Sequence, residues 1–139
     1  MVSKNLSNKI GFVNGCFDVL HVGHTRLLNF ARAKCDHLIV GIDSDNRVKL
    51  LKGNNRPYNA SDIRCEMLMS LKSVDEVKIF YDEDSLKNLI KLTNPDIMVV
   101  GSDYVDKHVI GGEYAKELIY FERIPGYSSS EIFRHSSNR

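Results

Sequence analysis

Short apolar runs alternate along this chain with segments of helical periodicity, and this alternation limits its fold more than any other feature. Five runs have the length and apolar content of buried strands. They are residues 10–13, 37–42, 77–80, 97–100 and 118–121. Helices are expected in between, over residues 24–33, 59–71 and 85–93. Strands that alternate with helices over short loops predict an α/β fold, a doubly wound parallel five-stranded sheet of the Rossmann-like kind with right-handed crossovers.

The second and third expected helices have a distinct apolar face. Asn59 is the expected N-cap of the second helix, with Asp62 in its first turn. Its apolar side chains recur at helical spacing at Ile63, Met67, Leu68 and Leu71. Those of the third helix are Leu86, Leu89, Ile90 and Leu92. Both sets are expected to face the sheet.

Length and composition describe one globular domain. The 139 residues suit a single domain over 1–139, with an ordered core expected over about 9–135, and 42% of them are apolar. A net charge of +1 gives no reason to expect nucleic acid as a partner. No apolar run approaches the roughly 20 residues of a membrane helix, and the N-terminus has no signal-peptide core. We therefore expect no membrane association and a cytoplasmic location.

The three cysteines are expected to be reduced and mostly structural. Cys16, Cys35 and Cys65 are odd in number and widely spaced, which argues against disulfides and a cysteine zinc site. Cys16 precedes an expected helix start but has no other feature of an activated thiolate. A small core residue is the preferred interpretation there.

In a doubly wound sheet, ligands bind outside the carboxyl ends of the strands, where the strand order reverses. This rule selects four loops for inspection before any motif is named. They are residues 14–24, 43–59, 101–112 and 123–130.

The first of these loops is suited to an anion. Gly15 and Gly23 allow the backbone to approach a ligand closely, and the helix after it offers unpaired N–H groups and the positive end of its dipole. His21 and His24 are placed to direct imidazole donors at the same phosphate. A metal site and a structural pair of hydrogen-bonded histidines are the alternatives, and no third His or Cys has a spacing that favours the metal.

The other loops add cations, hydroxyls and a second helix start. The second loop carries Lys49, Lys52 and Arg56, followed by Arg64. Asp103 follows the fourth strand, and the last loop contains Arg123, Tyr127, Ser128 and Ser129. Each group alone has an ordinary alternative, a solvated charged face or a turn. Their joint position at one edge of the expected sheet favours phosphate binding.

Two motifs now identify a resemblance. GCFDVLHVGH resembles the (G)xFDxxHxGH signature of the cytidylyltransferase-like nucleotidyltransferases, and IPGYSSSEI resembles their second signature, commonly written RTEGISTT. The resemblance extends over about residues 10–135. LKGNNRP, GSDY with VIGG, and GYSSSEI are most similar to the heptose-1-phosphate adenylyltransferase domain of ADP-heptose synthases. Arg123 instead stands where glycerol-3-phosphate cytidylyltransferases have an arginine, and Ser102, Ser129 and Ser130 depart from the usual residues.

The resemblance implies a reaction and residue roles. A substrate phosphate attacks the α-phosphorus of a nucleoside triphosphate and releases pyrophosphate, so no protein nucleophile is needed. It implies catalytic roles for His21, His24 and Lys52, and nucleotide-binding roles for Gly15, Phe17, Asp18, Gly23, Asp103, Arg123, Tyr127, Ser128 and Ser129. Asp18 is expected either to orient the first loop or to approach the magnesium-triphosphate. It implies that Lys49, Arg56 and Arg64 bind the β and γ phosphates or the acceptor phosphate.

The same resemblance implies the ligands. They are ATP or CTP with Mg²⁺, and a small phosphorylated sugar or alditol, with heptose 1-phosphate and ATP as the first expectation and glycerol 3-phosphate and CTP as the alternative. A homodimer is a further expectation. A nucleotide-binding module without turnover is the alternative from another class.

Overall fold

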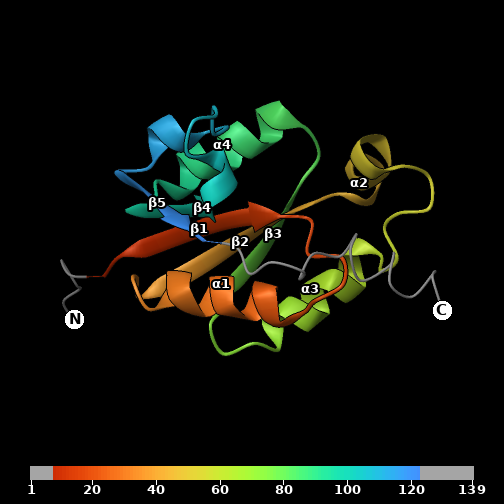
Figure 1. The fold of residues 1–139 in the computed structure, drawn as a ribbon, viewed down its shortest axis with the longest axis horizontal. Helices are drawn as coiled ribbons and strands as arrows, with labels where there is room; N and C mark the ends of the chain where they lie inside the picture. The colour runs from red at the N-terminus through yellow and green to blue at the C-terminus, as the bar shows by residue number, and fades with distance from the viewer. Residues whose placement is uncertain (1–7, 123–139) are drawn as a thin grey trace.

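The computed structural model describes residues 8–122, in which five parallel strands form one sheet with helices on both faces (Figure 1). The strands are β1 (Ile10–Gly15), β2 (His37–Asp43), β3 (Glu76–Phe80), β4 (Ile97–Gly101) and β5 (Glu117–Phe121). The helices are α1 (Val22–Arg32), α2 (Asp45–Lys52), α3 (Ser61–Met69) and α4 (Glu83–Thr93). Two short 3-10 helices, Ser102–Tyr104 and Gly112–Tyr114, lie between β4 and β5.

The strand order is β3-β2-β1-β4-β5, with all neighbours parallel. β1 lies between β2 and β4, so the winding reverses at the carboxyl end of β1. Ligands of doubly wound sheets bind at this reversal. The loop that follows β1 is therefore the first place to look for a site, and the expected Rossmann-like fold class is confirmed.

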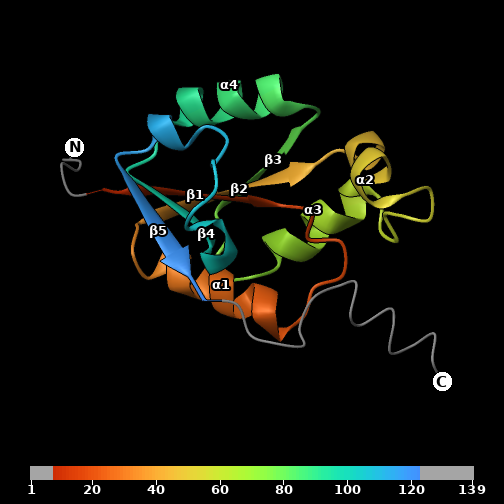
Figure 2. The same cartoon turned by 45° about the horizontal axis from the view of Figure 1, so that its top comes forward.

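The two faces of the sheet are covered by different helices. α1 and α3 lie on one face and α4 lies on the other, while α2 follows the carboxyl end of β2 (Figures 1 and 2). Alternate strand residues point to opposite faces. Val13, Val40 and Leu28 belong to the core on the α1 side, whereas Phe12 and Ile90 belong to the core on the α4 side.

Some expectations for the helices are wrong. α2 forms where a loop is expected. The N-cap of α3 is Ala60 rather than Asn59, and the buried side chains of α3 are Arg64 and Leu68. Ile63 and Met67, expected to face the sheet, are exposed, as is Leu92 of α4. In α3 the inward position is taken by Arg64 instead, because backbone carbonyls on that side accept its hydrogen bonds.

Within residues 8–122, none of the helices combines the length and the apolar character that crossing a bilayer requires.

Candidate functional site

The histidine pair stands at the start of α1 and forms its N-terminal cap. His21 is the N-cap residue in an extended conformation, and its Nδ1 accepts a hydrogen bond from the backbone N–H of Gly23 at 3.1 Å. His24 Nδ1 accepts one from the backbone N–H of His21 at 3.3 Å. The two rings stack with centroids 3.8 Å apart. A capping box made by two histidines therefore holds both rings side by side at the positive end of the helix dipole.

The capping bonds also fix the chemistry of the rings. A ring nitrogen that accepts a backbone N–H cannot carry a hydrogen, so the neutral form of each imidazole has its hydrogen on Nε2. Both side chains are consequently donors at Nε2. Two donors and a helix start are chemically suited to the oxygens of a phosphate chain, and the Nε2 atom of His21 is buried in the described structure.

Phe17 supports the pair from inside the protein. It is 4% exposed, adopts a positive φ of 52°, and places its ring centroid 5.2 Å from that of His24. A Cβ at Gly15 would lie 3.0 Å from this ring, so a larger residue there would require the ring to shift by a few tenths of an ångström. In the described structure Phe17 is a packing residue of the first loop.

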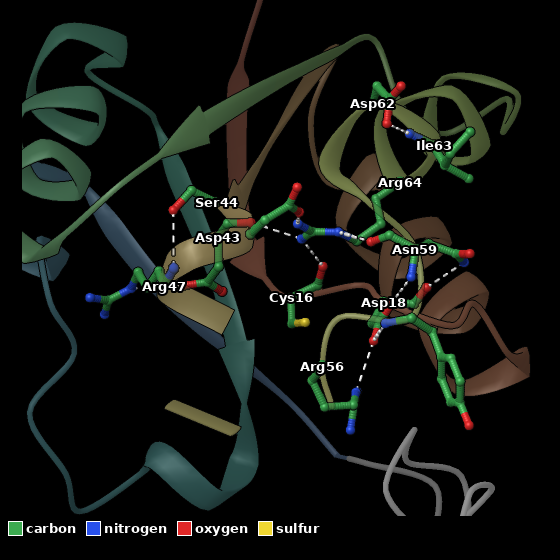
Figure 3. A network of polar contacts seen from close by, with 12 residues as sticks. Cys16, Asp18, Asp43, Ser44, Arg47, Arg56, Asn59, Asp62, Ile63 and Arg64 are labelled. Carbon is green, nitrogen blue, oxygen red and sulfur yellow. Dashed lines mark hydrogen bonds and ion pairs between the residues drawn. The ribbon is translucent and has the colours of Figure 1, made fainter. Parts of the chain in front are cut away.

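Asp18 binds the first loop to residues 56–59. Its side chain is fully buried, and its carboxylate accepts hydrogen bonds from Arg56 Nε at 2.9 Å and from the backbone N–H groups of Tyr58 and Asn59, each at 2.8 Å (Figure 3). Burial by itself raises the pKa of Asp18, but these hydrogen bonds outweigh it and the pKa is lowered. Asp18 is thus a buried anion that fixes two loops to each other.

Arg64 reaches the same place from α3. Its guanidinium donates to the carbonyl oxygens of Asn59, Cys16 and Asp43 at 3.0, 3.0 and 2.8 Å, and to Asp45 Oδ1 at 2.6 Å (Figure 3). The side chain is 0% exposed. The structure therefore places Arg64 beneath the site, with its donors used inside the protein.

Lys49 and Lys52 are exposed on the last turn of α2. Burial raises the pKa of the Cys16 thiol, and the largest opposing influence is the charge of Lys52, ahead of that of Arg64. The charge of Lys52, on a separate element, therefore acts on Cys16 in the first loop. The raised pKa also agrees with Cys16 as a structural thiol.

The structure brings most of the described candidates to one edge of the sheet. Gly15, His21, Gly23, His24 and Lys52 belong to the first loop, α1 and α2 at that edge. Asp103 is exposed in the 3-10 helix that follows β4. Arg123, Tyr127, Ser128 and Ser129 lie outside the described residues.

Two residues that the sequence interpretation missed complete the network. Asn59 donates its side-chain Nδ2 to the carbonyl of Asp18 at 2.9 Å, and Asp45 receives Arg64. For Asp45 the local sequence contains a signal, because a serine followed by an acidic residue is typical of a helix start, and Ser44 is the N-cap of α2. No local signal exists for Asn59, since its partners are 41 residues away.

Among residues 8–122, no group of three or more His, Cys, Asp or Glu side chains is arranged to hold a metal ion. The buried Asp18 carboxylate is occupied by three N–H donors. The described residues thus form no carboxylate cage for Mg²⁺.

Comparisons with known proteins show which family the chain belongs to. Residues 12–135 match the family model described as cytidylyltransferase-like. The chain is 51% identical over 124 residues to the bifunctional protein HldE of Helicobacter pylori strain P12, and 49% identical over 121 residues to that of Campylobacter fetus. These matches cover 89% and 87% of this chain but 27% and 26% of the relatives. The chain therefore spans about a quarter of the length of these curated relatives.

Solved structures support the fold. A lipopolysaccharide core biosynthesis protein from Thermoplasma volcanium superposes with a TM-score of 0.64 at 21% identity, over 84% of this chain and 98% of the other. Pantoate-beta-alanine ligase from Francisella tularensis, solved with beta-gamma ATP and beta-alanine, gives 0.59 at 19% identity, over 97% of this chain and 71% of the other. At these identities the likeness shows a shared fold.

Proposed function

Because the chain belongs to the cytidylyltransferase-like family, we propose that it is a nucleotidyltransferase that transfers a nucleoside monophosphate from a nucleoside triphosphate to a sugar phosphate. The observation that supports this most is the stacked histidine pair, which caps α1 at the point where the sheet reverses its winding. The preferred substrates are ATP and heptose 1-phosphate, with ADP-heptose and pyrophosphate as products. LKGNNRP and GSDY, together with about 50% identity to the HldE proteins, favour this choice.

The reaction needs positioning more than chemical groups from the protein. An oxygen of the acceptor phosphate forms a bond to the α-phosphorus, and the bond from that phosphorus to the bridging oxygen breaks, so that pyrophosphate leaves with the electron pair. His21 and His24 would donate from Nε2 to phosphate oxygens that gain charge, and the ammonium group of Lys52 would hold the departing phosphates. Mg²⁺ bound to the triphosphate would neutralise part of its charge.

Other parts of the proposal concern the remaining residues. Arg123, Tyr127, Ser128 and Ser129 would contact ribose or phosphate, and Lys49, Arg56 and Asp103 would contact substrate. Phe17, Asp18 and Arg64 would serve the ligand indirectly, since their side chains are buried and engaged within the protein. A cytoplasmic location and a homodimer complete the proposal.

The test is pyrophosphate release by the purified chain with Mg²⁺, using ATP or CTP against heptose 1-phosphate or glycerol 3-phosphate. We expect release with ATP and heptose 1-phosphate, and its loss with a chelator. Release only with CTP and glycerol 3-phosphate would support the cytidylyltransferase alternative that Arg123 favours. Nucleotide binding without release from any pair would overturn the proposed activity.

A further inference from the structure

Arg64 occupies an unusual position for a charged side chain. It is 1% exposed as a residue. Its guanidinium lies among carbonyl oxygens at the carboxyl ends of β1 and β2, next to residues 16–21, which we call the histidine loop. Such a charge is expensive to bury unless its donors are satisfied. Its position therefore needs an explanation beyond packing.

The hydrogen bonds of Arg64 Nη1 explain its buried position. The last paired residues of β1 and β2 are Gly15 and Ile42. One residue later, Arg64 Nη1 donates both to Cys16 O and to Asp43 O. The guanidinium thus bridges β1 and β2 where the hydrogen-bonded pairing of the two strands ends. It therefore sets the direction in which the histidine loop leaves the sheet.

The remaining contacts extend this bridge to two helices. Nη2 binds Asp45 in the first turn of α2, the helix that carries Lys52, and Nε binds Asn59 O just before α3. Asn59 in turn donates to Asp18 through its backbone N–H and its Nδ2. Figure 3 shows these contacts converging from separate segments. The Arg64 side chain therefore holds both the histidine loop and α2, the helix that carries Lys52.

We propose that Arg64 is a positioning residue of the transferase site, which fixes the histidine loop relative to α2 and does not touch the substrate. This inference rests on the proposed function. Loss of its hydrogen bonds would leave buried carbonyls unsatisfied and let the histidines and Lys52 drift apart. A displacement of about 1 Å in a site of this kind lowers the rate about a hundredfold.

The test compares Arg64→Lys with Arg32→Lys. Arg32 is a matched control because it also bridges a carbonyl and a carboxylate, Cys35 O and Asp75, but at the C-terminal end of α1, away from the site. Well below both melting temperatures, we expect kcat to fall about a hundredfold in Arg64→Lys, with the KM of the acceptor changed less than about threefold. Arg32→Lys is expected to keep its kcat. A rise in acceptor KM with kcat retained, or equal kcat in the two variants, would overturn the proposal.

Amide hydrogen exchange supplies a readout that does not depend on turnover. Residues 16–21 and 44–48 are expected to exchange faster in Arg64→Lys than in the wild type, and to be unchanged in Arg32→Lys. If Arg64→Lys does not fold, Asp45→Ala, which removes the exposed partner of the guanidinium, is measured in its place and should show the same change at a smaller size. Unchanged exchange in these segments would refute the role of Arg64. An inactive wild type with the expected exchange pattern would refute only the proposed function.

Discussion

At the scale of single residues, His24 uses its two ring nitrogens for different purposes. Nδ1 caps α1 through the backbone N–H of His21, and Nε2 carries the hydrogen that a phosphate would accept. An asparagine places its oxygen where Nδ1 lies and has nothing at Nε2. We therefore expect His24→Asn to lower pyrophosphate release about 100- to 1000-fold with little change in melting temperature.

The glutamine variant is the matched control for His24. Glutamine has an N–H near the position of Nε2 but no acceptor for the His21 amide. His24→Gln should retain more turnover than His24→Asn while losing about 1 kcal/mol of stability with the cap. Thermal melts and turnover measured on both variants separate the two tasks. Near-normal turnover in His24→Asn would remove this ring from the chemistry.

Asp18 predicts how stability depends on pH. Its folded pKa is lowered, so the unfolded chain binds the proton more readily and acidification favours unfolding. The stabilisation by Asp18 is full near neutrality, begins to decline as the pH approaches the ordinary value of 3.8, and disappears below the folded pKa. Asparagine cannot accept all three donors and removes the charge beside Arg56, at a cost of about 3–5 kcal/mol at pH 7.

Urea unfolding at a series of pH values tests this expectation. The difference in unfolding free energy between the wild type and Asp18→Asn should shrink as the pH falls below about 5. A difference that stayed constant with pH would contradict the assigned role of the Asp18 charge.

At the scale of elements, α3 lacks a side-chain cap, unlike the other α-helices of residues 8–122. His21, Ser44 and Asp82 cap α1, α2 and α4, whereas the N-cap of α3 is Ala60, which makes no side-chain hydrogen bond. Its φ of −62° and ψ of 161° suit a serine. Ala60→Ser is expected to raise the free energy of unfolding by about 1 kcal/mol, because the hydroxyl satisfies an unpaired N–H of the first turn. Urea unfolding measures this gain in stability. An unchanged free energy of unfolding in Ala60→Ser would mean that water already satisfies the N–H groups at the start of this helix.

The elements also show what periodicity can predict. The five strands agree with the sequence prediction to within two residues at either end, since buried parallel strands are continuous apolar runs. α2 has no such pattern, because Leu50 and Leu51 are exposed and only Val48 is buried. In α3 the hydrophobic pattern selects Leu68, which is buried, but also Ile63 and Met67, which are exposed, and it does not select the buried Arg64. Burial through hydrogen bonds to distant carbonyls leaves no periodic signal.

The same limit applies to the site. The motif GCFDVLHVGH predicted the turn and its histidines, because glycine and histidine at a strand end have few other uses together. It left open whether Asp18 orients the first loop or approaches the nucleotide, and the sequence did not predict that Arg64 is held inside the protein, since their partners come from elements far along the chain. Local residue types therefore predict which groups can face a ligand, and tertiary contacts decide which of them support the others.

At the scale of the whole molecule, the two layers have different tasks. α1, α2 and α3 carry or brace the candidate site, whereas α4 covers the opposite face of the sheet (Figure 2). The core under α4 contains Phe12 and Ile90, both fully buried. Changes confined to this core should lower stability without altering turnover by the folded protein.

Gly41 tests that separation. A Cβ built on this β2 residue would lie 2.8 Å from Cζ of Phe12 and 3.4 Å from Cδ2 of Leu89 in α4. Phe12 is 0% exposed and cannot swing into solvent. Gly41→Ala should therefore cost about 1–3 kcal/mol of stability through overpacking. Phe12→Leu shortens the side chain that the new methyl group would strike, so the double variant should be less destabilised than the sum of the single variants, with a coupling of about 0.5–3 kcal/mol.

Urea unfolding of the four proteins in this cycle gives the coupling, and turnover below the melting temperatures gives the second readout. Additive destabilisation would mean that Gly41→Ala acts through the backbone rather than through the Phe12 ring. A loss of turnover in the folded Gly41→Ala protein would mean that strain in the α4 layer crosses the sheet to the histidine loop. We expect neither, because Gly41 and Phe12 meet on the face of the sheet opposite α1 and α3, which hold that loop in place.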